Sequence, residues 1–173
     1  TFWTVLSLVL IGCTPSLGDS SEHPPLQQLA PVKSQSIDNG PCEPNVTCLA
    51  VFPYKASKTT LEKSTATLDG YACDPDKNES GPENIYRVQI PEEGLLIAQV
   101  ADLHPSTDVD VHILTQLDAA SCLSRGDHTS VAKVKPGFAY VVVDSFSGSR
   151  KAGPYTLTIN FMGPSSLSAH GLR

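Results

Sequence analysis

Apolar and polar residues alternate with a period of two along the central part of the chain. Within residues 84–90, Tyr86, Val88 and Ile90 occupy alternate positions between more polar neighbours, and the run stops at Pro91. Successive side chains of a strand point to opposite faces of a sheet, so this pattern predicts a half-buried strand. No stretch of the sequence keeps a helical period over three turns.

Further short runs of strand character follow, separated by residues that favour turns. They cover residues 94–101, 108–115, 129–134, 138–145 and 155–161. Lys-Pro-Gly at 135–137 and Gly-Pro at 153–154 are turn sequences ahead of two of these runs. The 14 prolines, 12 glycines and only 17% charged residues also fit a turn-rich β protein. We therefore predict an all-β fold, an antiparallel β-sandwich over residues 41–163.

An uncharged apolar segment stands at the start of the sequence. Residues 2–12 are fewer than the ~20 that a membrane-spanning helix needs, and they are typical of a secretion signal. They lead into Leu-Ile-Gly-Cys at residues 10–13, which resembles a bacterial lipobox. That resemblance implies a signal peptide over residues 1–12, truncated here, and a lipid on Cys13. The alternative is a buried apolar strand that ends in an ordinary cysteine.

The lipobox resemblance also implies where the protein is located. More than one acyl chain on Cys13 is enough for stable membrane anchoring, so we expect a lipid-anchored protein of the cell envelope. Thr14, in place of Asp, resembles the sorting pattern for the outer membrane of a Gram-negative cell. Residues 13–40 are rich in Ser, Pro and Gln and predict a flexible tether, and residues 164–173 predict a flexible tail.

The cysteine count agrees with export. Apart from Cys13, the chain has Cys42, Cys48, Cys73 and Cys122, an even number that can pair completely in an oxidising compartment. Four cysteines allow three connectivities, and the sequence does not choose among them. We favour Cys42 with Cys48 and Cys73 with Cys122. A zinc site is the rival use of four thiols, but no spacing is C-x-x-C.

The acidic composition of the chain makes cations candidate ligands. The net charge of −6 and the absence of a basic patch argue against nucleic acid as a partner. In the acidic segment 74–83, oxygen donors stand at alternate positions, Asp74, Asp76 and Asn78, as in loops that bind calcium. The segment is not an EF-hand, because Glu79 stands where that loop needs glycine. The alternative is a solvated acidic turn.

Two aspartates near the start of a predicted strand form a second group of candidate calcium ligands. Asp108 and Asp110 share one face of that strand, and Asp144 comes at the end of another. Turn chemistry at strand ends is the alternative explanation for each of them. Calcium is the cofactor that the sequence suggests, and its predicted ligands are Asp74, Asp76, Asn78, Glu79, Asp108 and Asp110.

Five segments in order resemble the bacterial pre-peptidase C-terminal domain family. They are residues 85–88, 94–98, 108–114, 136–144 and 153–159. The most specific are the Asp-x-Asp strand at 108–114 and the final Gly-Pro-Tyr-x-Leu. The resemblance implies a jelly-roll-like β-sandwich of the kind appended to secreted peptidases. Related sandwiches of secreted collagenases bind calcium through acidic loops, which favours calcium here as well.

The sequence contains no recognisable catalytic set. There is no H-E-x-x-H and no G-x-S-x-G, and His112 lies alone on the polar face of its strand. Residues 125–127 read Arg-Gly-Asp, which matches an integrin-binding tripeptide, but hairpin-turn chemistry explains it better. We therefore predict that the chain is not an enzyme.

The expected function is non-catalytic binding or display. Exposed aromatic side chains such as Tyr140 or Tyr155 would contact an extracellular protein or polysaccharide, unless they belong to the core. The protein is expected to be a monomer. The alternative is an accessory folding or targeting domain of an exported hydrolase whose catalytic part is absent from this chain.

Overall fold

The computed structural model of the chain describes residues 41–61, 65–146 and 151–165. The predicted signal peptide, the predicted lipidation site Cys13 and the predicted tether up to residue 40 lie outside these ranges. All described residues belong to one compact unit. Within them, no helix is long and apolar enough to cross a bilayer.

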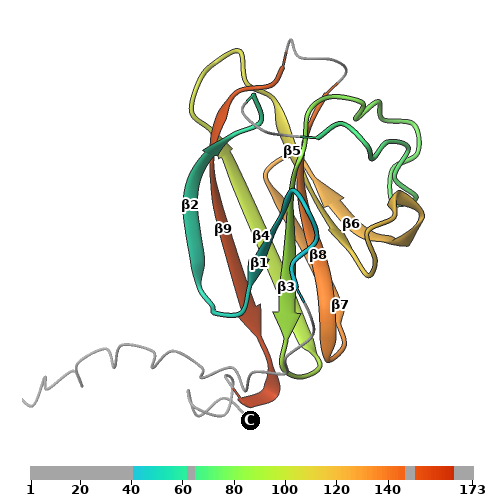
Figure 1. Cartoon of the computed structure of the whole chain (residues 1–173), viewed down its shortest axis with the longest axis vertical. Coiled ribbons are helices and arrows are strands. Elements are labelled where there is room, and N and C mark those ends of the chain that lie inside the picture. The colour runs from blue at the N-terminus through green and yellow to red at the C-terminus, as the bar shows by residue number, and fades with distance from the viewer. Residues whose placement is uncertain (1–40, 62–64, 147–150, 166–173) are drawn as a thin grey trace, which may run out of the picture. The chain divides into compact units, whose positions relative to one another are not determined.

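Two sheets face each other and form a sandwich (Figure 1). Sheet A has the order β1 (Val46–Leu49), β3 (Asn84–Ile90), β8 (Gly137–Ser145), β5 (Val109–Leu114) and β6 (Cys122–Gly126). Sheet B has the order β2 (Tyr54–Thr59), β9 (Pro154–Met162), β4 (Gly94–Asp102) and β7 (Thr129–Val134). A short 3₁₀ helix, η1 (Ala119–Ser121), precedes β6.

The predicted antiparallel β-sandwich is confirmed. Every strand pair is antiparallel except β1 with β3, which is parallel. The six strands expected from alternation correspond to β3, β4, β5, β7, β8 and β9. The pattern missed β1, β2 and β6, which are outermost strands of their sheets and contain fewer apolar residues.

The main core lies between the two sheets. Every second residue of the central strands points into this core. Examples are Val88, Val111 and Val141 of sheet A and Leu96 and Ile159 of sheet B, which are all fully buried. Each such side chain stabilises the fold by about 1.5–3 kcal/mol relative to an exposed position. The period-two alternation therefore places one face of each strand in this core.

A second, smaller apolar cluster covers the outer face of sheet A. Its buried members are Leu68, Tyr71, Ile85, Leu114 and Val142. Leu68 and Tyr71 come from the long connection between β2 and β3, which lies over this face. The prediction that residues 84–90 are buried on one face only is wrong, because six of the seven are buried. A covered outer face is what makes the polar side chains on it unusual.

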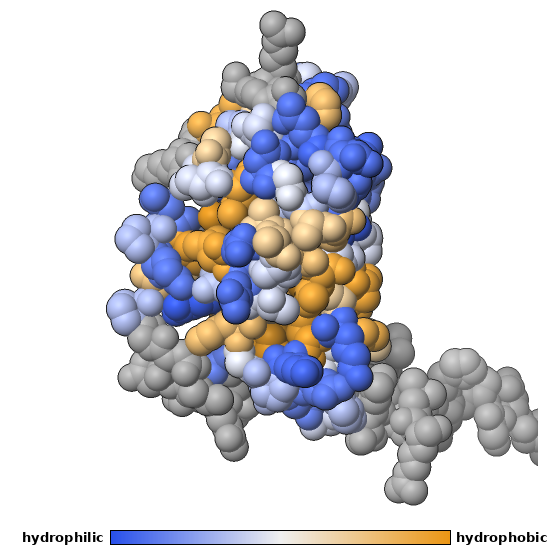
Figure 2. Space-filling view, turned by 90° about the vertical axis from the view of Figure 1, so that its right-hand side faces the viewer, coloured by the Kyte–Doolittle hydropathy of each residue, from blue (hydrophilic) through white to orange (hydrophobic). Residues whose placement is uncertain are grey.

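The side of the sandwich near β6 and β7 is partly apolar. Figure 2 shows apolar surface across the middle of this side, between hydrophilic ends. Leu95, Leu123 and Val131, on β4, β6 and β7, are each between 42% and 45% exposed. These side chains are scattered over three strands and form no described pocket with one another.

Candidate functional site

The polar residues of β5 face away from the main core. Asp110 and His112 alternate with the core residues Val111 and Ile113, so they lie on the outer face of sheet A. Both are almost completely buried, at 4% and 0% exposure. Charged and polar groups are rarely buried to this extent without partners.

A β-bulge brings two residues of β6 onto this same face. The register of β5 with β6 shifts between Ile113 and Leu114, so His112 pairs with Arg125 and Leu114 pairs with Cys122. Cys122 and Arg125 are three positions apart, and a regular strand would point them to opposite faces. The bulge therefore places a cysteine and an arginine beside the buried polar residues of β5.

The guanidinium of Arg125 is surrounded by four carboxylates. Its Nη2 lies 2.9 Å from Asp110 Oδ2 and 3.2 Å from Glu79 Oε1. Its Nη1 lies 2.9 Å from Asp127 Oδ1 and 3.5 Å from Asp74 Oδ2. We call these five residues the Arg125 cluster.

The cluster is crowded with negative charge. Burial raises the pKa of Asp110 to about 8. A hydrogen bond with Glu79 and the charge of Glu79 also raise this pKa, whereas Arg125 lowers it. Burial disfavours the charged guanidinium, but Asp110 and Glu79 outweigh it and raise the pKa of Arg125. At neutral pH, Asp110 is therefore mostly protonated and Arg125 is charged.

Three predicted calcium ligands, Asp74, Glu79 and Asp110, thus come together in space, but around an arginine. The other three lie apart from the cluster. Asp76 is exposed, Asn78 Oδ1 accepts hydrogen bonds from the Ser80 amide and hydroxyl, and Asp108 pairs with Lys151 at 3.3 Å. Calcium binding stays a prediction, and an ion would have to compete with Arg125 for its ligands.

The Arg-Gly-Asp tripeptide spans the end of β6 and the start of the turn to β7, because Arg125 and Gly126 are the last residues of β6 and Asp127 lies in the turn. The side chain of Arg125 is only 13% exposed because it points into its cluster. A Cβ atom at Gly126 would lie 2.0 Å from the Thr129 carbonyl oxygen, so only glycine fits this close approach. The sequence pointed to Arg125 only as part of this tripeptide and missed its role in the acidic site.

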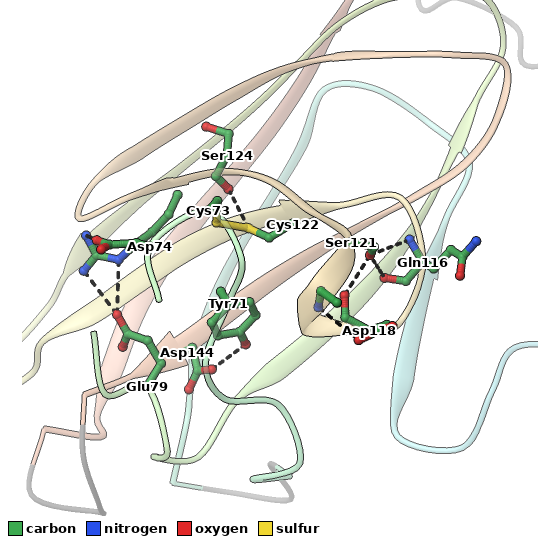
Figure 3. The surroundings of a disulfide bond; sticks show 12 residues. Tyr71, Cys73, Asp74, Glu79, Gln116, Asp118, Ser121, Cys122, Ser124 and Asp144 are labelled. Carbon is green, nitrogen blue, oxygen red and sulfur yellow. Dashed lines mark hydrogen bonds and ion pairs between the residues drawn. A yellow bond between two sulfur atoms is a disulfide. The ribbon is translucent and has the colours of Figure 1, made fainter. Parts of the chain in front are cut away.

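His112 lies between the Arg125 cluster and a second buried acid. Its imidazole stacks on the ring of Tyr71, with centroids 3.8 Å apart and planes at 15°. The Tyr71 hydroxyl donates a 2.6 Å hydrogen bond to Asp144 Oδ2, as Figure 3 shows. Burial raises the pKa of Asp144 to about 9 and, with the charge of Arg125, lowers that of His112 to about 3. His112 is therefore neutral at physiological pH.

Both favoured disulfides are present. Cys42 is bonded to Cys48, and Cys73 is bonded to Cys122. The second bond attaches the connection between β2 and β3 to β6, next to Tyr71 (Figure 3). Two disulfides are typical of proteins exported to an oxidising compartment.

Another buried carboxylate, missed by the sequence analysis, fastens the start of the same connection. Glu83 is 1% exposed. Its Oε1 accepts hydrogen bonds from the hydroxyls of Thr65 and Thr67 and from the Thr67 amide, at 2.7–2.9 Å. Its Oε2 accepts one from the Leu68 amide at 3.1 Å. No local sequence signal marks Glu83 among the acids of this segment.

The predicted aromatic contact residues are not open platforms. Tyr155 is fully buried, and its hydroxyl lies 2.9 Å from that of Tyr86, so its proposed contact with a polymer is wrong. Tyr140 is half-buried on the outer face of sheet A and donates a hydrogen bond to Glu43. A ligand therefore needs another surface.

A groove of about 700 Å³ provides such a surface at the opening between β1 and β2. These are the outermost strands of sheets A and B. Its lining comprises Asn45, Val46, Thr47, Ser57, Lys58, Thr59, Asn84, Ile85, Tyr86, Leu103 and Pro154. Asn84 Nδ2 donates to the Thr59 carbonyl and to the Tyr155 hydroxyl, and so joins β3 to both β2 and β9 at the groove.

Comparison with known proteins gives remote similarities. The chain matches no known family profile and no curated protein. The pre-peptidase C-terminal domain of a collagenase from Bacillus anthracis is 14% identical with a TM-score of 0.45, over 71% of this chain and 100% of that one. At that TM-score it does not assign the chain to a family.

Two further solved structures are periplasmic inhibitors of g-type lysozyme. PliG of Aeromonas hydrophila is 12% identical with a TM-score of 0.43, over 68% of this chain and 98% of that one. PliG of Salmonella Typhimurium is 11% identical with a TM-score of 0.37, over 68% and 99% of the two chains. Their function does not transfer to this chain at such scores.

Proposed function

We propose that this chain is a non-catalytic binding module of the bacterial cell envelope, anchored through a lipid on Cys13, and that its groove between β1 and β2 binds an extended polypeptide segment. The observation that carries the binding role is the groove itself. Its volume of about 700 Å³ lies in the range of established ligand sites, about 300–1,000 Å³.

The position of the groove favours a polypeptide in extended conformation. Among the described residues, β1 pairs only with β3 and β2 pairs only with β9, so each has one edge without a partner strand. An unpaired edge presents backbone N–H and C=O groups to an added strand. Tyr86 is the aromatic residue of the lining and is buried, so the groove itself offers no exposed ring for stacking on a sugar.

A lysine gives the groove a charge preference. Lys58 lines the groove. It is four positions from Tyr54, so the two side chains lie on the same side of β2. The ring centroids of Tyr54 and Tyr86 are 6.0 Å apart, which identifies this side as the inner one. Lys55 is on the opposite side of the same strand and is not among the lining residues. We therefore expect preferred segments to carry a carboxylate.

The test is a selection from a random eight-residue peptide library on the full chain. The selected peptides are then titrated against Lys58→Glu and against its matched control, Lys55→Glu. We expect acidic residues among the selected peptides, a loss of affinity on the order of tenfold for Lys58→Glu and unchanged affinity for Lys55→Glu. Chemical shifts of backbone amides should move in β1 and β2. Equal binding by both variants, or no selected peptide, would overturn the proposal.

A further inference from the structure

We propose that Cys73, Cys122 and His112 form a Zn²⁺ site when the Cys73–Cys122 disulfide is reduced. One ligand atom of each residue, the two Sγ atoms and a ring nitrogen, lies within 4.8 Å of the other two. In a tetrahedral zinc site with bonds of about 2.0–2.3 Å, ligand atoms lie about 3.5–3.8 Å apart. The three side chains therefore need only small shifts to reach one ion.

Three separate parts of the chain bring these ligands together. His112 is on β5, and the bulge between β5 and β6 turns Cys122 toward the same outer face. Cys73 follows Tyr71 in the connection that covers this face. The apolar cluster around Leu114 and Tyr71 holds that connection in place. The ligands thus have a scaffold in addition to the bond between the two sulfurs.

The imidazole carries the second and independent observation. His112 is 0% exposed, and neither of its ring nitrogens has a hydrogen-bond partner within the described part of the chain. A buried polar group without a partner is costly and rare in folded proteins. Stacking on Tyr71 fixes the plane of the ring beside the two sulfurs. A ligand for one ring nitrogen explains why a histidine stands at this buried position.

The other cysteine pair shows the contrast. Cys42, Cys48 and Glu43 also have ligand atoms within 4.8 Å of one another. However, Glu43 already pairs with Arg87 at 3.0 Å and accepts a hydrogen bond from Tyr140. Both cysteines are exposed. Because its acid is already ion-paired and its cysteines are exposed, this group is a poorer metal site, and both cysteines are replaced in the experiment below.

The chemistry requires one two-electron reduction. A dithiol attacks the Cys73–Cys122 bond and leaves as a cyclic disulfide, so that two electrons and two protons pass to the cysteine sulfurs. Zn²⁺ then binds both thiolates and the neutral imidazole and releases the two thiol protons. Two cysteines and one histidine leave a fourth position for water, as in catalytic zinc sites.

The experiment compares oxidised and reduced full-length chain in a Cys13→Ser, Cys42→Ser, Cys48→Ser background. A phosphine reductant opens the remaining disulfide, and Zn²⁺ affinity is measured by competition with a chelating dye. Co²⁺ as a probe should give sulfur-to-metal charge-transfer absorption. We expect one Zn²⁺ per chain in the reduced form only, with affinity reduced on the order of tenfold or more by His112→Leu.

X-ray absorption of the reduced, zinc-loaded triple-serine background, in which His112 is intact, gives a readout that does not depend on how His112→Leu folds. Two sulfur neighbours near 2.3 Å and one nitrogen near 2.0–2.1 Å are expected. Equal zinc affinity of the oxidised and reduced chains would overturn the proposal. So would unchanged affinity in a folded His112→Leu variant, or a shell of four sulfurs that requires two chains.

Discussion

The ring of Tyr71 stacks on the imidazole of His112 at 3.8 Å, while its hydroxyl donates to Asp144 at 2.6 Å. One side chain from the β2–β3 connection thus contacts two buried titratable groups on neighbouring strands of sheet A. The Cys73–Cys122 disulfide and Glu83 hold the same connection in place. The outer face of sheet A therefore encloses a buried polar layer.

The buried acid Asp144 should make the stability of the fold pH-dependent. Because burial raises its pKa to about 9, the folded chain keeps a proton that the unfolded chain releases above about pH 4. The stabilisation that this proton gives the folded state is fully present at low pH and is lost as the pH rises toward 9. Its contribution to the unfolding free energy falls by about 1.4 kcal/mol per pH unit between about pH 5 and 8.

Asp144→Asn removes this proton equilibrium and keeps the shape of the side chain. Urea unfolding at several pH values should show the variant gaining stability relative to the wild type as pH rises. Asp76→Asn, an exposed change in the neighbouring acidic segment, is the control and should follow the wild-type curve. Parallel curves for Asp144→Asn and the wild type would contradict the prediction.

Arg125 should be essential for stability because it neutralises buried carboxylates. Arg125→Met keeps the length of the side chain but leaves Asp110 and Glu79 without their cation. We expect a loss of about 3–5 kcal/mol in unfolding free energy near pH 8. The loss should be smaller at pH 5, where Asp110 is protonated in the folded protein. Lys133→Met, which removes an exposed partner of Glu93, should leave stability nearly unchanged.

Calcium and Arg125 should exclude each other. Because the guanidinium already contacts Asp74, Glu79 and Asp110, millimolar calcium should not raise the thermal midpoint of the wild type relative to a chelator. In Arg125→Met, calcium should raise the midpoint by binding the freed carboxylates in the folded state. A calcium-dependent midpoint in the wild type that Asp74→Asn abolishes would instead support a site with the arginine displaced.

Glu83 should stabilise the fold through the hydrogen bonds that it accepts. Glu83→Gln replaces one carboxylate oxygen with a donor and removes the negative charge that strengthens the remaining bonds. Chemical unfolding should show a loss of about 1–3 kcal/mol. Glu93→Gln is the matched control, because Glu93 is exposed and pairs only with an exposed lysine among the described residues. Similar stabilities of the two variants would refute this role of Glu83.

The predicted anchor can be tested in cells. The protein, expressed from its own gene in a bacterium, should incorporate a clickable fatty acid and sediment with membranes. Cys13→Ser should abolish both. Labelling of Cys13→Ser at the wild-type level would show that the lipobox resemblance is misleading.

Strong alternation was enough to predict most of the sandwich. β3, β5 and β8 have apolar residues at every second position because one face must pack against sheet B. β1 and β6 gave no such signal, because they are only four and five residues long and show no regular alternation of apolar and polar residues. The two disulfides follow from the cysteine count, but their pairing needed the fold.

The sequence by itself determined the fold class, the inner faces of the central strands and the acidic character of residues 74–83. Only the tertiary structure showed that Arg125 lies among those acids. It also placed Cys122 beside His112. A single bulge in the β5–β6 pairing reverses which residues of β6 face outward. The physical reason is that strand register depends on contacts between distant segments, which local alternation does not encode.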